Sequence, residues 1–304
     1  MRTIYINRLD EIFNKESLTI MLGNFDGLHR GHQELLKEVM KYKTYHALLT
    51  FDPHPLKLLK DPNFKVLDTI KDKEDELATK LDYLVVLKTS KKILHESKES
   101  FIKFLKNNNV KNVICGSDFT FGNNKEGSVA DLNEFNLDVV PDFTLYNKRV
   151  SSTLIRQYLK DGNIRRANHL LGRPYKIRGC VSHGNEIGRT IGFRTANIEA
   201  NEYLFPKSGV YFGKIKIDSK FYFGMINIGT NPTFNKVKER LEVNIFDFDA
   251  NIYDKNIEVY FLAFIRDEKK FNSKEELILE LKKNKEECIC LSKFVNWKSK
   301  FRCK

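Results

Sequence analysis

The hydrophobic pattern of the sequence changes once, about half way along the chain, and this change constrains the fold more than any other feature. In the first half, short apolar runs alternate with longer amphipathic stretches, as strands and crossover helices do around a parallel sheet. The candidate strands are residues 18–22, 46–51, 83–87 and 112–115, and the candidate helices are residues 32–42, 73–80 and 99–106. This pattern predicts a doubly wound α/β domain.

Beyond residue 150 the pattern first becomes helical and then turns to closely spaced strands. Hydroxyl side chains at residues 151–153 can cap a helix that runs to residue 160, and a second helix over 164–171 ends at Gly172. Strand runs follow at residues 176–181, 210–217, 221–228, 241–246 and 257–264, with Gly, Asn or Asp turns between them. They predict a small antiparallel β-barrel, and a helix over 273–285 is expected to pack against it. We predict domains of residues 1–173 and 174–304.

Length and composition limit the function classes. A chain of 304 residues is long enough for two domains, and no apolar run approaches the roughly 18 residues that a membrane span needs. Asp10 and Glu11 stand where a signal peptide would be apolar, so we expect a cytoplasmic protein. The five cysteines are scattered and lack CxxC spacing, which favours reduced thiols over structural zinc. A net charge of +12 suits nucleic acid or an acidic small molecule, but a lysine-rich solvated surface explains most of it.

The first strand runs straight into a glycine-rich turn that carries two histidines. Glycines let the backbone approach a ligand closely, and the start of the following helix favours an anion. His29 and His32 are three residues apart at that helix start, so both can point toward one phosphate. Histidines in this position also serve as ordinary helix caps, and the pair by itself leaves both interpretations open.

The HxGH spacing behind a strand resembles the signature of the nucleotidyltransferase superfamily, and the run from Ser151 to Arg156 resembles its ISSTxxR motif. Those enzymes transfer a nucleotide without a covalent enzyme intermediate, so positioned cations stabilise charge at the α-phosphate. The resemblance implies His29, His32 and Arg156 as catalytic residues. It also implies that ATP and its phosphates are bound by Gly23, Phe25, Asp26, Gly27, Gly31, Ser151, Ser152 and Thr153.

Two further runs, at residues 51–55 and 116–122, resemble the FMN adenylyltransferase branch of that superfamily. The resemblance implies that His54 and Asp118 help to hold the flavin phosphate and the nucleotide. Without the resemblance, the first run is only a strand end broken by two prolines. Asp118 lies just beyond a strand, where open α/β sheets bind their ligands.

The second half carries a glycine-rich run over residues 188–197 and, later, a strand with a polar face. In that strand Leu241, Val243 and Ile245 face one way, whereas Glu242 faces the other. A single strand glutamate usually belongs to a solvated exterior. Together, however, the two features resemble riboflavin kinase, with its GRxLGFPTANI motif and its later strand glutamate. Residues 209–211 and 227–234 also match that family in order and spacing.

The kinase resemblance implies a role for each motif residue. Thr195 and Asn197 would bind Mg²⁺ and ATP phosphate, Gly188 would belong to the ATP-binding loop, and Glu242 would be the base. This chemistry is reasonable, because a hydroxyl that attacks a γ-phosphate needs a carboxylate to accept its proton, and Mg²⁺ prefers oxygen ligands.

Three positions depart from the kinase family. Arg194 stands where the family usually has proline, Asn244 where it often has histidine, and Asp254 where it often has glycine. Loss of the proline loosens a loop, but an arginine can contact a phosphate. We therefore expect altered affinity before loss of activity.

Taken in order, the motifs resemble the bifunctional riboflavin kinase/FMN adenylyltransferase family, also called the prokaryotic FAD synthetase family. The resemblance implies a nucleotidyltransferase-like Rossmann-type domain followed by a riboflavin kinase-like barrel with a C-terminal helix. Riboflavin would be phosphorylated to FMN, and FMN adenylylated to FAD with release of pyrophosphate, with Mg²⁺ as cofactor and ATP as co-substrate. We expect small-molecule substrates, no nucleic acid or membrane partner, and a monomer or weak homo-oligomer.

Two alternatives remain at this stage. One is an FMN adenylyltransferase whose barrel binds flavin without catalysis, and the departure at Arg194 favours it. The other is an RNA-binding module, suggested by the net charge. It predicts basic residues gathered with aromatics on one face, whereas the lysines here are spread over most of the expected helices.

Overall fold

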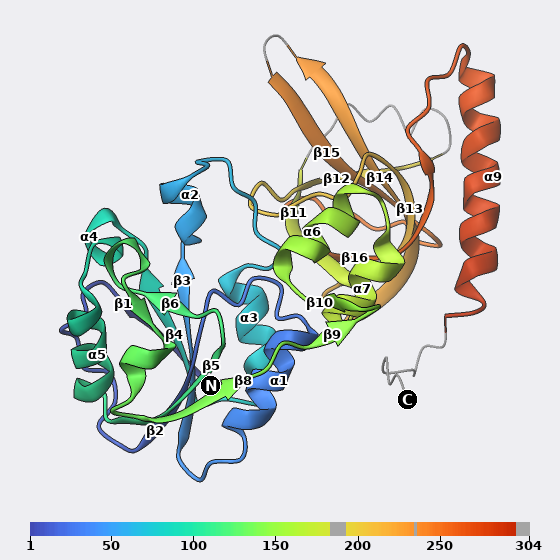
Figure 1. The fold of residues 1–304 in the computed structure, drawn as a ribbon. Coiled ribbons are helices and arrows are strands. Elements are labelled where there is room, and N and C mark those ends of the chain that lie inside the picture. The colour runs from blue at the N-terminus through green and yellow to red at the C-terminus, as the bar shows by residue number, and fades with distance from the viewer. Residues whose placement is uncertain (183–192, 234–235, 296–304) are drawn as a thin grey trace. The chain divides into compact units, whose positions relative to one another are not determined.

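The apolar run at residues 18–22 forms the central strand β2 (Leu18–Leu22), and every one of its residues is buried. A strand buried on both faces needs a layer of helices on each side, and the surrounding elements supply them. The computed structural model describes residues 1–182, 193–233 and 236–295, and the chain forms two compact units, Met1–Ser152 and Thr153–Lys304 (Figure 1).

The first unit is built on a six-stranded sheet in the order β1-β4-β3-β2-β5-β8, in which all pairings are parallel. The other strands of this sheet are β1 (Arg2–Ile6), β3 (Tyr45–Asp52), β4 (Tyr83–Lys88), β5 (Val110–Gly116) and β8 (Asn136–Val140). The four predicted strands are confirmed, and the edge strands β1 and β8 were not predicted. The chain moves outward from β2 through β3 to β4 and then returns to the other side of β2 as β5. The ends of β2 and β5 therefore form a switch point, where open α/β sheets bind ligands.

Helices cover both faces of this sheet. They are α1 (Arg30–Val39), α3 (Ile70–Leu77), α4 (Lys91–Leu94) and α5 (Lys98–Asn107), whereas the short helix α2 (Pro55–Leu59) has no buried residue. Leu35 and Val39 of α1 and Leu77 of α3 belong to one core cluster, whereas Phe101 and Phe104 of α5 belong to the cluster on the opposite face. Three of these helices, α1, α3 and α5, correspond to the predicted helices and begin one to three residues earlier than predicted.

Short elements close the first unit. Two small two-stranded sheets pair β6 (Thr120–Phe121) with β7 (Gly127–Ser128), and β9 (Thr144–Leu145) with β10 (Lys148–Arg149). Two 3-10 turns, Asn123–Lys125 and Val129–Leu132, lie between β6 and β8.

The second unit contains the predicted antiparallel barrel, which is closed in the order β11-β12-β15-β14-β13-β16. Its strands are β11 (Tyr175–Ser182), β12 (Ala196–Glu199), β13 (Gly209–Ile217), β14 (Lys220–Thr233), β15 (Lys236–Ile245) and β16 (Asn256–Asp267). Short β12 was not predicted as a strand. The C-terminal helix α9 (Lys274–Ser292) packs against the barrel through buried Cys288 and extends further than predicted.

Two helices precede the barrel, α6 (Ser152–Lys160) and α7 (Ile164–Leu171). Asn168 of α7 is buried; its side chain donates to the carbonyl oxygen of Phe261 (2.8 Å) and accepts from the backbone N–H of Tyr175 (2.7 Å). These bonds fasten α7 to β16 and β11. The compact units divide at the start of α6, so α7 is counted with the barrel. The domain boundary between residues 173 and 174 stays a prediction.

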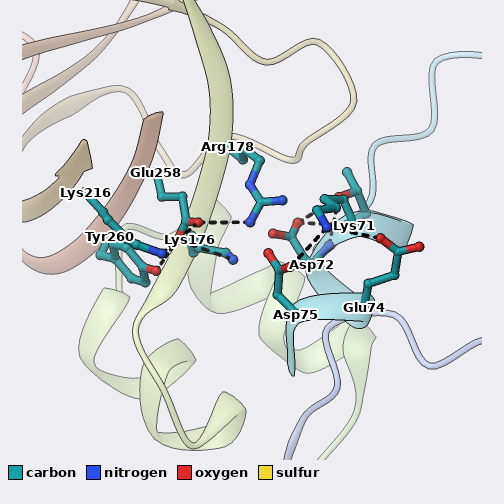
Figure 2. A network of polar contacts seen from close by, with 10 residues as sticks. Lys71, Asp72, Glu74, Asp75, Lys176, Arg178, Lys216, Glu258 and Tyr260 are labelled. Carbon is teal, nitrogen blue, oxygen red and sulfur yellow. Dashed lines mark hydrogen bonds and ion pairs between the residues drawn. The ribbon is translucent and has the colours of Figure 1, made fainter. Parts of the chain in front are cut away.

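A charged cluster lies on the barrel wall, where Glu258 of β16 faces cations on both neighbouring strands (Figure 2). Its carboxylate lies 2.9 Å from Arg178, 3.5 Å from Lys216 and 3.7 Å from Lys176, and it accepts from the hydroxyl of Tyr260. Burial pushes the pKa of this carboxyl up, but the tyrosine hydroxyl and the three cations outweigh burial and hold the pKa below its ordinary value.

Candidate functional site

A hollow of about 720 Å³ opens where β2 and β5 end, within the first unit. Its volume lies in the range of small-molecule sites. The turn after β2 contributes Gly23 and Phe25, and the start of α1 contributes Gly31 and both predicted histidines. Most of the residues predicted for nucleotide binding in this unit are thus brought to one cavity.

The two histidines form a stacked pair at the start of α1. His29 is the N-cap, is 5% exposed, and its Nδ1 accepts the backbone N–H of His32 at 3.3 Å. The two rings lie 3.6 Å apart with 17° between their planes, and the edge of Phe25 packs against His32 at 5.0 Å. His29 therefore both caps α1 and lines the cavity, so the two interpretations of the histidine pair do not exclude one another.

The turn that leads into α1 has an unusual backbone. Phe25 and Leu28 have φ values of 49° and 40°, and Gly27 has 91°, so two ordinary residues lie in the left-handed region. Strain of this kind persists only where surrounding contacts impose it. Two bonds do so here, because Asp26 Oδ1 accepts the backbone N–H of Leu67 at 2.7 Å, and Ser152 Oγ donates to the Asp26 carbonyl oxygen at 2.8 Å.

These contacts give Asp26 and Ser152 a supporting position. Asp26 is 4% exposed and its carboxylate holds a backbone amide, so it shapes the turn. Its predicted part in phosphate binding stays a prediction. Ser151, next to Ser152, lines the cavity directly.

Part of the cavity lining is apolar. This part includes Phe51 at the end of β3 and Phe119 and Phe121 beyond β5, with several leucines. A planar aromatic ligand can stack or wedge against such a surface. The lining thus combines the histidine pair with apolar side chains that suit a ring system.

His54 precedes Pro55, which lines this cavity, but His54 itself is not among the lining residues. It is the N-cap of α2, where its Nδ1 accepts the N–H of Leu56 at 3.2 Å, and its ring stacks on Phe64 with centroids 4.5 Å apart. The predicted role of His54 in flavin binding remains a prediction.

Asp118 does line the cavity, and it is held by an arginine that the motif analysis did not select. Arg149 Nη2 donates to Asp118 Oδ2 at 2.7 Å, and Arg149 Nε lies 2.9 Å from Asp142 Oδ1. All three side chains lie at the cavity. Arg149 lies two residues before the run from Ser151 to Arg156, here called the hydroxyl motif, but nothing in the local sequence marks its two acidic partners.

The remaining residues of the hydroxyl motif lie on α6. Thr153 is exposed in the first turn, and Arg156 follows about one turn later and is partly buried. Both belong to the second unit by packing.

In the barrel, strand register brings the predicted kinase residues together. Asn197 of β12 lies opposite Glu242 of β15, and Glu242 also lies opposite Asn227 of β14. Directly opposed residues on antiparallel strands project from the same face, with Cβ atoms roughly 4.5–5.5 Å apart. Leu241 and Val243 are buried on the other face, so the prediction that Glu242 stands on a polar face is confirmed.

Glu242 is shielded but accessible, since its side chain is 24% exposed and lies 3.6 Å from the guanidinium of Arg240. A second hollow, of about 220 Å³, lies near this row and is lined by Thr195, Asn244, Asp247 and Lys285 among others. Gly188 lies outside the described residues.

The donor set suits Mg²⁺. The hydroxyl of Thr195 and the amide oxygen of Asn197 are hard oxygen ligands, and Mg²⁺ keeps water and phosphate oxygens as its other ligands. Within the described parts of the chain, no group of three or more His, Cys, Asp or Glu side chains could hold a metal ion. A magnesium site built from one hydroxyl, one amide and a nucleotide would not need one.

Two departures from the kinase pattern contact each other. The side chain of Asn244 donates to the backbone carbonyl of Arg194 at 2.7 Å. The guanidinium of Arg194 in turn pairs with Asp249 at 2.8 Å. The side chain of Asn244 therefore ties β15 to the backbone of Arg194, the position at which the family usually has proline.

Two family models match separate parts of the chain. The family model for FAD synthetase matches residues 12–154, and the model for riboflavin kinase matches residues 171–291. A bifunctional riboflavin kinase/FMN adenylyltransferase of Listeria monocytogenes is 36% identical and covers 94% of this chain and 97% of its own length. The protein of that name from Bacillus subtilis is 35% identical, with 95% and 98% covered.

Among solved structures, one described as a macrolide-efflux protein from Streptococcus pneumoniae superimposes with a TM-score of 0.86. It is 36% identical, and the match covers 93% of this chain and 97% of that one. The described part of this chain has no helix with the length and apolarity to cross a membrane.

Proposed function

The chain belongs to the bifunctional riboflavin kinase/FMN adenylyltransferase family, and from that premise we propose how its residues divide the two reactions. The enzyme phosphorylates riboflavin to FMN and adenylylates FMN to FAD. The assignment of residues to each step is the proposal that follows.

The adenylylation step is assigned to the cavity at the end of β2 and β5. A phosphate oxygen of FMN attacks the α-phosphate of ATP, the new P–O bond forms, and pyrophosphate leaves. The stacked His29 and His32 support this assignment, because they meet the N-terminus of α1, where N–H groups and the helix dipole favour anionic oxygens. Arg156 is assigned to the charge that develops in the transition state. The phenylalanines of the cavity lining suit the flavin ring.

The phosphorylation step is assigned to the row Asn197, Glu242 and Asn227. Glu242 accepts the proton of the riboflavin hydroxyl that attacks the γ-phosphate of ATP. The observation that carries this assignment is the register that sets Glu242 opposite Asn197, because it places a carboxylate beside the amide proposed for Mg²⁺ and ATP. Mg²⁺, when bound, neutralises phosphate charge, and Thr195 and Asn197 are the residues that would hold it.

The test is a chromatographic assay of the purified enzyme with riboflavin, ATP and Mg²⁺, beside Glu242→Gln and His29→Ala. We expect the wild type to form FAD, Glu242→Gln to leave riboflavin unconverted, and His29→Ala to accumulate FMN. Glu242→Gln supplied with FMN should still form FAD, which controls for folding. Repeating the assay with EDTA tests the requirement for Mg²⁺.

A wild type that converts FMN but ignores riboflavin would support the alternative, a transferase whose barrel does not catalyse. The match of residues 171–291 to riboflavin kinase and the row around Glu242 favour two working sites.

We further propose a cytoplasmic enzyme, because its co-substrate ATP is an intracellular metabolite. Among the described residues, Cys115, Cys180, Cys288 and Cys290 are free thiols, which suits a reducing compartment. We propose only small-molecule partners, and a monomer or weak homo-oligomer. Cell fractionation and light scattering at two protein concentrations test these points.

A further inference from the structure

Arg194 lies near the end of the kinase motif, residues 188–197, and immediately precedes Thr195. Its guanidinium pairs with Asp249 at 2.8 Å, and the two side chains are 45% and 94% exposed. Ion pairs as exposed as this one contribute little stability, because water and salt screen the charges and both side chains lose freedom when they pair. A competing anion of higher charge can therefore displace the carboxylate.

The hollow beside Arg194 already has the charge and polarity to attract such an anion. Arg194 and Thr195 line it together with Lys285 of α9, whose Nζ lies 5.5 Å from the centroid of the Phe246 ring. Asp247 is the acidic residue of the described lining. Once Asp249 is displaced from Arg194, two cations and one carboxylate line this cavity. Thr195, the residue after Arg194, lines it too and is proposed to bind ATP phosphate.

The backbone of Arg194 is fixed independently of its side chain. The ladder between β12 and β15 includes the pair of Ala196 with Val243, and Asn244 continues the attachment by donating to the Arg194 carbonyl at 2.7 Å. The guanidinium can thus change partner without moving the chain that carries Thr195.

We propose that Arg194 is a phosphate-binding residue of the kinase site, which exchanges Asp249 for a phosphate oxygen of ATP when the nucleotide binds. This inference rests on the proposed kinase function. A guanidinium offers several N–H donors in a planar fork, so it binds phosphate more strongly than it binds one exposed carboxylate. Arg194 then replaces, by charge, part of what the usual proline supplies by rigidity.

The exchange makes opposite predictions for the two partners. In the full-length enzyme, Arg194→Gln should raise the KM for ATP in riboflavin phosphorylation by about ten-fold, with little change in the KM for riboflavin. Asp249→Asn should leave the KM for ATP unchanged or lower it, because the competing carboxylate is gone. Adenylylation of supplied FMN, measured on the same samples, should be unaffected and reports correct folding.

The wild-type assay separates failure of the proposed function from failure of this inference. A wild type without kinase activity overturns the function, and the inference with it, before any variant is compared. With an active wild type, a similar rise in KM from Asp249→Asn and Arg194→Gln would show that the ion pair only anchors the loop. Unchanged kinetics in Arg194→Gln would show that the guanidinium does not meet the nucleotide. Either result overturns the inference.

Discussion

At the scale of single residues, the cavity proposed for adenylylation depends on how closely Gly31 approaches His29. A Cβ atom added at Gly31 would lie 3.2 Å from both Cε1 and Nδ1 of the His29 ring and 3.5 Å from the Val150 carbonyl oxygen. Only glycine leaves the ring in its present place without movement, so Gly31, in the first turn of α1, supports the geometry of the histidine pair.

We therefore expect Gly31→Ala to shift His29 and to slow adenylylation of FMN by roughly ten-fold, because a small displacement of a charge-stabilising group weakens its effect on the transition state. Steady-state assays of both steps check this. Riboflavin phosphorylation by the same protein should be unchanged and serves as the control, and an adenylylation rate equal to wild type would contradict the prediction.

Glu258 gives a pH-dependent prediction at the same scale. Its pKa is held below the ordinary value of 4.5, so its carboxylate stabilises the fold above about pH 4.5 and this contribution disappears as the pH falls through the lowered pKa. Glu258→Gln should lower the free energy of unfolding by about 2–3 kcal/mol at pH 7, since the side chain is only 14% exposed.

Denaturant titrations of both proteins at pH 7 and pH 3 test this. The difference between wild type and Glu258→Gln should shrink toward the lower pH, as the wild-type carboxyl becomes protonated on passing through its lowered pKa. A difference that stays constant across this range would mean that Glu258 acts through packing instead of charge.

At the scale of elements, Asn108 joins the chain segment before β2 to the end of α5. Its Oδ1 accepts the N–H groups of Phe13 and Asn14, at 2.7 and 3.2 Å, and its Nδ2 donates to the carbonyl oxygens of Glu11 and Phe104, at 3.1 and 3.0 Å. The side chain is fully buried and all its hydrogen-bonding positions are used.

Without this amide the N–H groups of Phe13 and Asn14 and the Glu11 carbonyl lose this hydrogen-bond partner, whereas the Phe104 carbonyl still accepts the Asn108 backbone N–H. We expect Asn108→Ala to destabilise the first unit by about 3 kcal/mol. Asn107→Ala is the matched control, since Asn107 is the preceding residue on the same helix and is exposed. Thermal unfolding monitored by circular dichroism should separate the two variants clearly. Equal melting temperatures would contradict the role of Asn108.

At the scale of the whole molecule, helices α6 and α7 are where two divisions of the chain differ. The predicted domains place them with the first half, whereas the compact units place them with the barrel, apart from Ser152. The hydroxyl motif on α6 is assigned to adenylylation, whereas α7 packs on the barrel through Asn168 and the buried Leu170 and Leu171. Dividing the chain before α6 or after α7 should therefore affect adenylylation and the stability of the barrel differently.

We expect a fragment of residues 153–304 to be more stable than one of residues 174–304, because the shorter one loses the apolar cover that α7 supplies. We also expect residues 1–173 to retain more adenylylation than residues 1–152, which lack Arg156. Unfolding curves and adenylylation assays of the four fragments test both points. If residues 174–304 were as stable as the longer fragment, α7 would not be part of the barrel's structural core.

The elements that the sequence predicted well are those whose patterns are local. The buried strands β2 to β5 appear as apolar runs, and α7 is bounded by Asn163 and Gly172, residues that begin and end helices through their own backbone chemistry. The edge strand β1 and the short strand β12 were missed because each is only partly buried, so neither shows a continuous apolar run.

The sequence by itself determined the two fold classes and the motif residues, because strand and helix periods, caps and glycine turns depend on neighbouring residues along the chain. Only the tertiary structure decided which side chains lie next to one another in the two candidate sites. Arg149 meets Asp118 and Asp142 because the first unit folds their separate segments to one cavity, and Glu242 meets Asn197 because closure of the barrel sets their register. Such contacts join residues far apart in sequence, and no local pattern encodes which of them will meet.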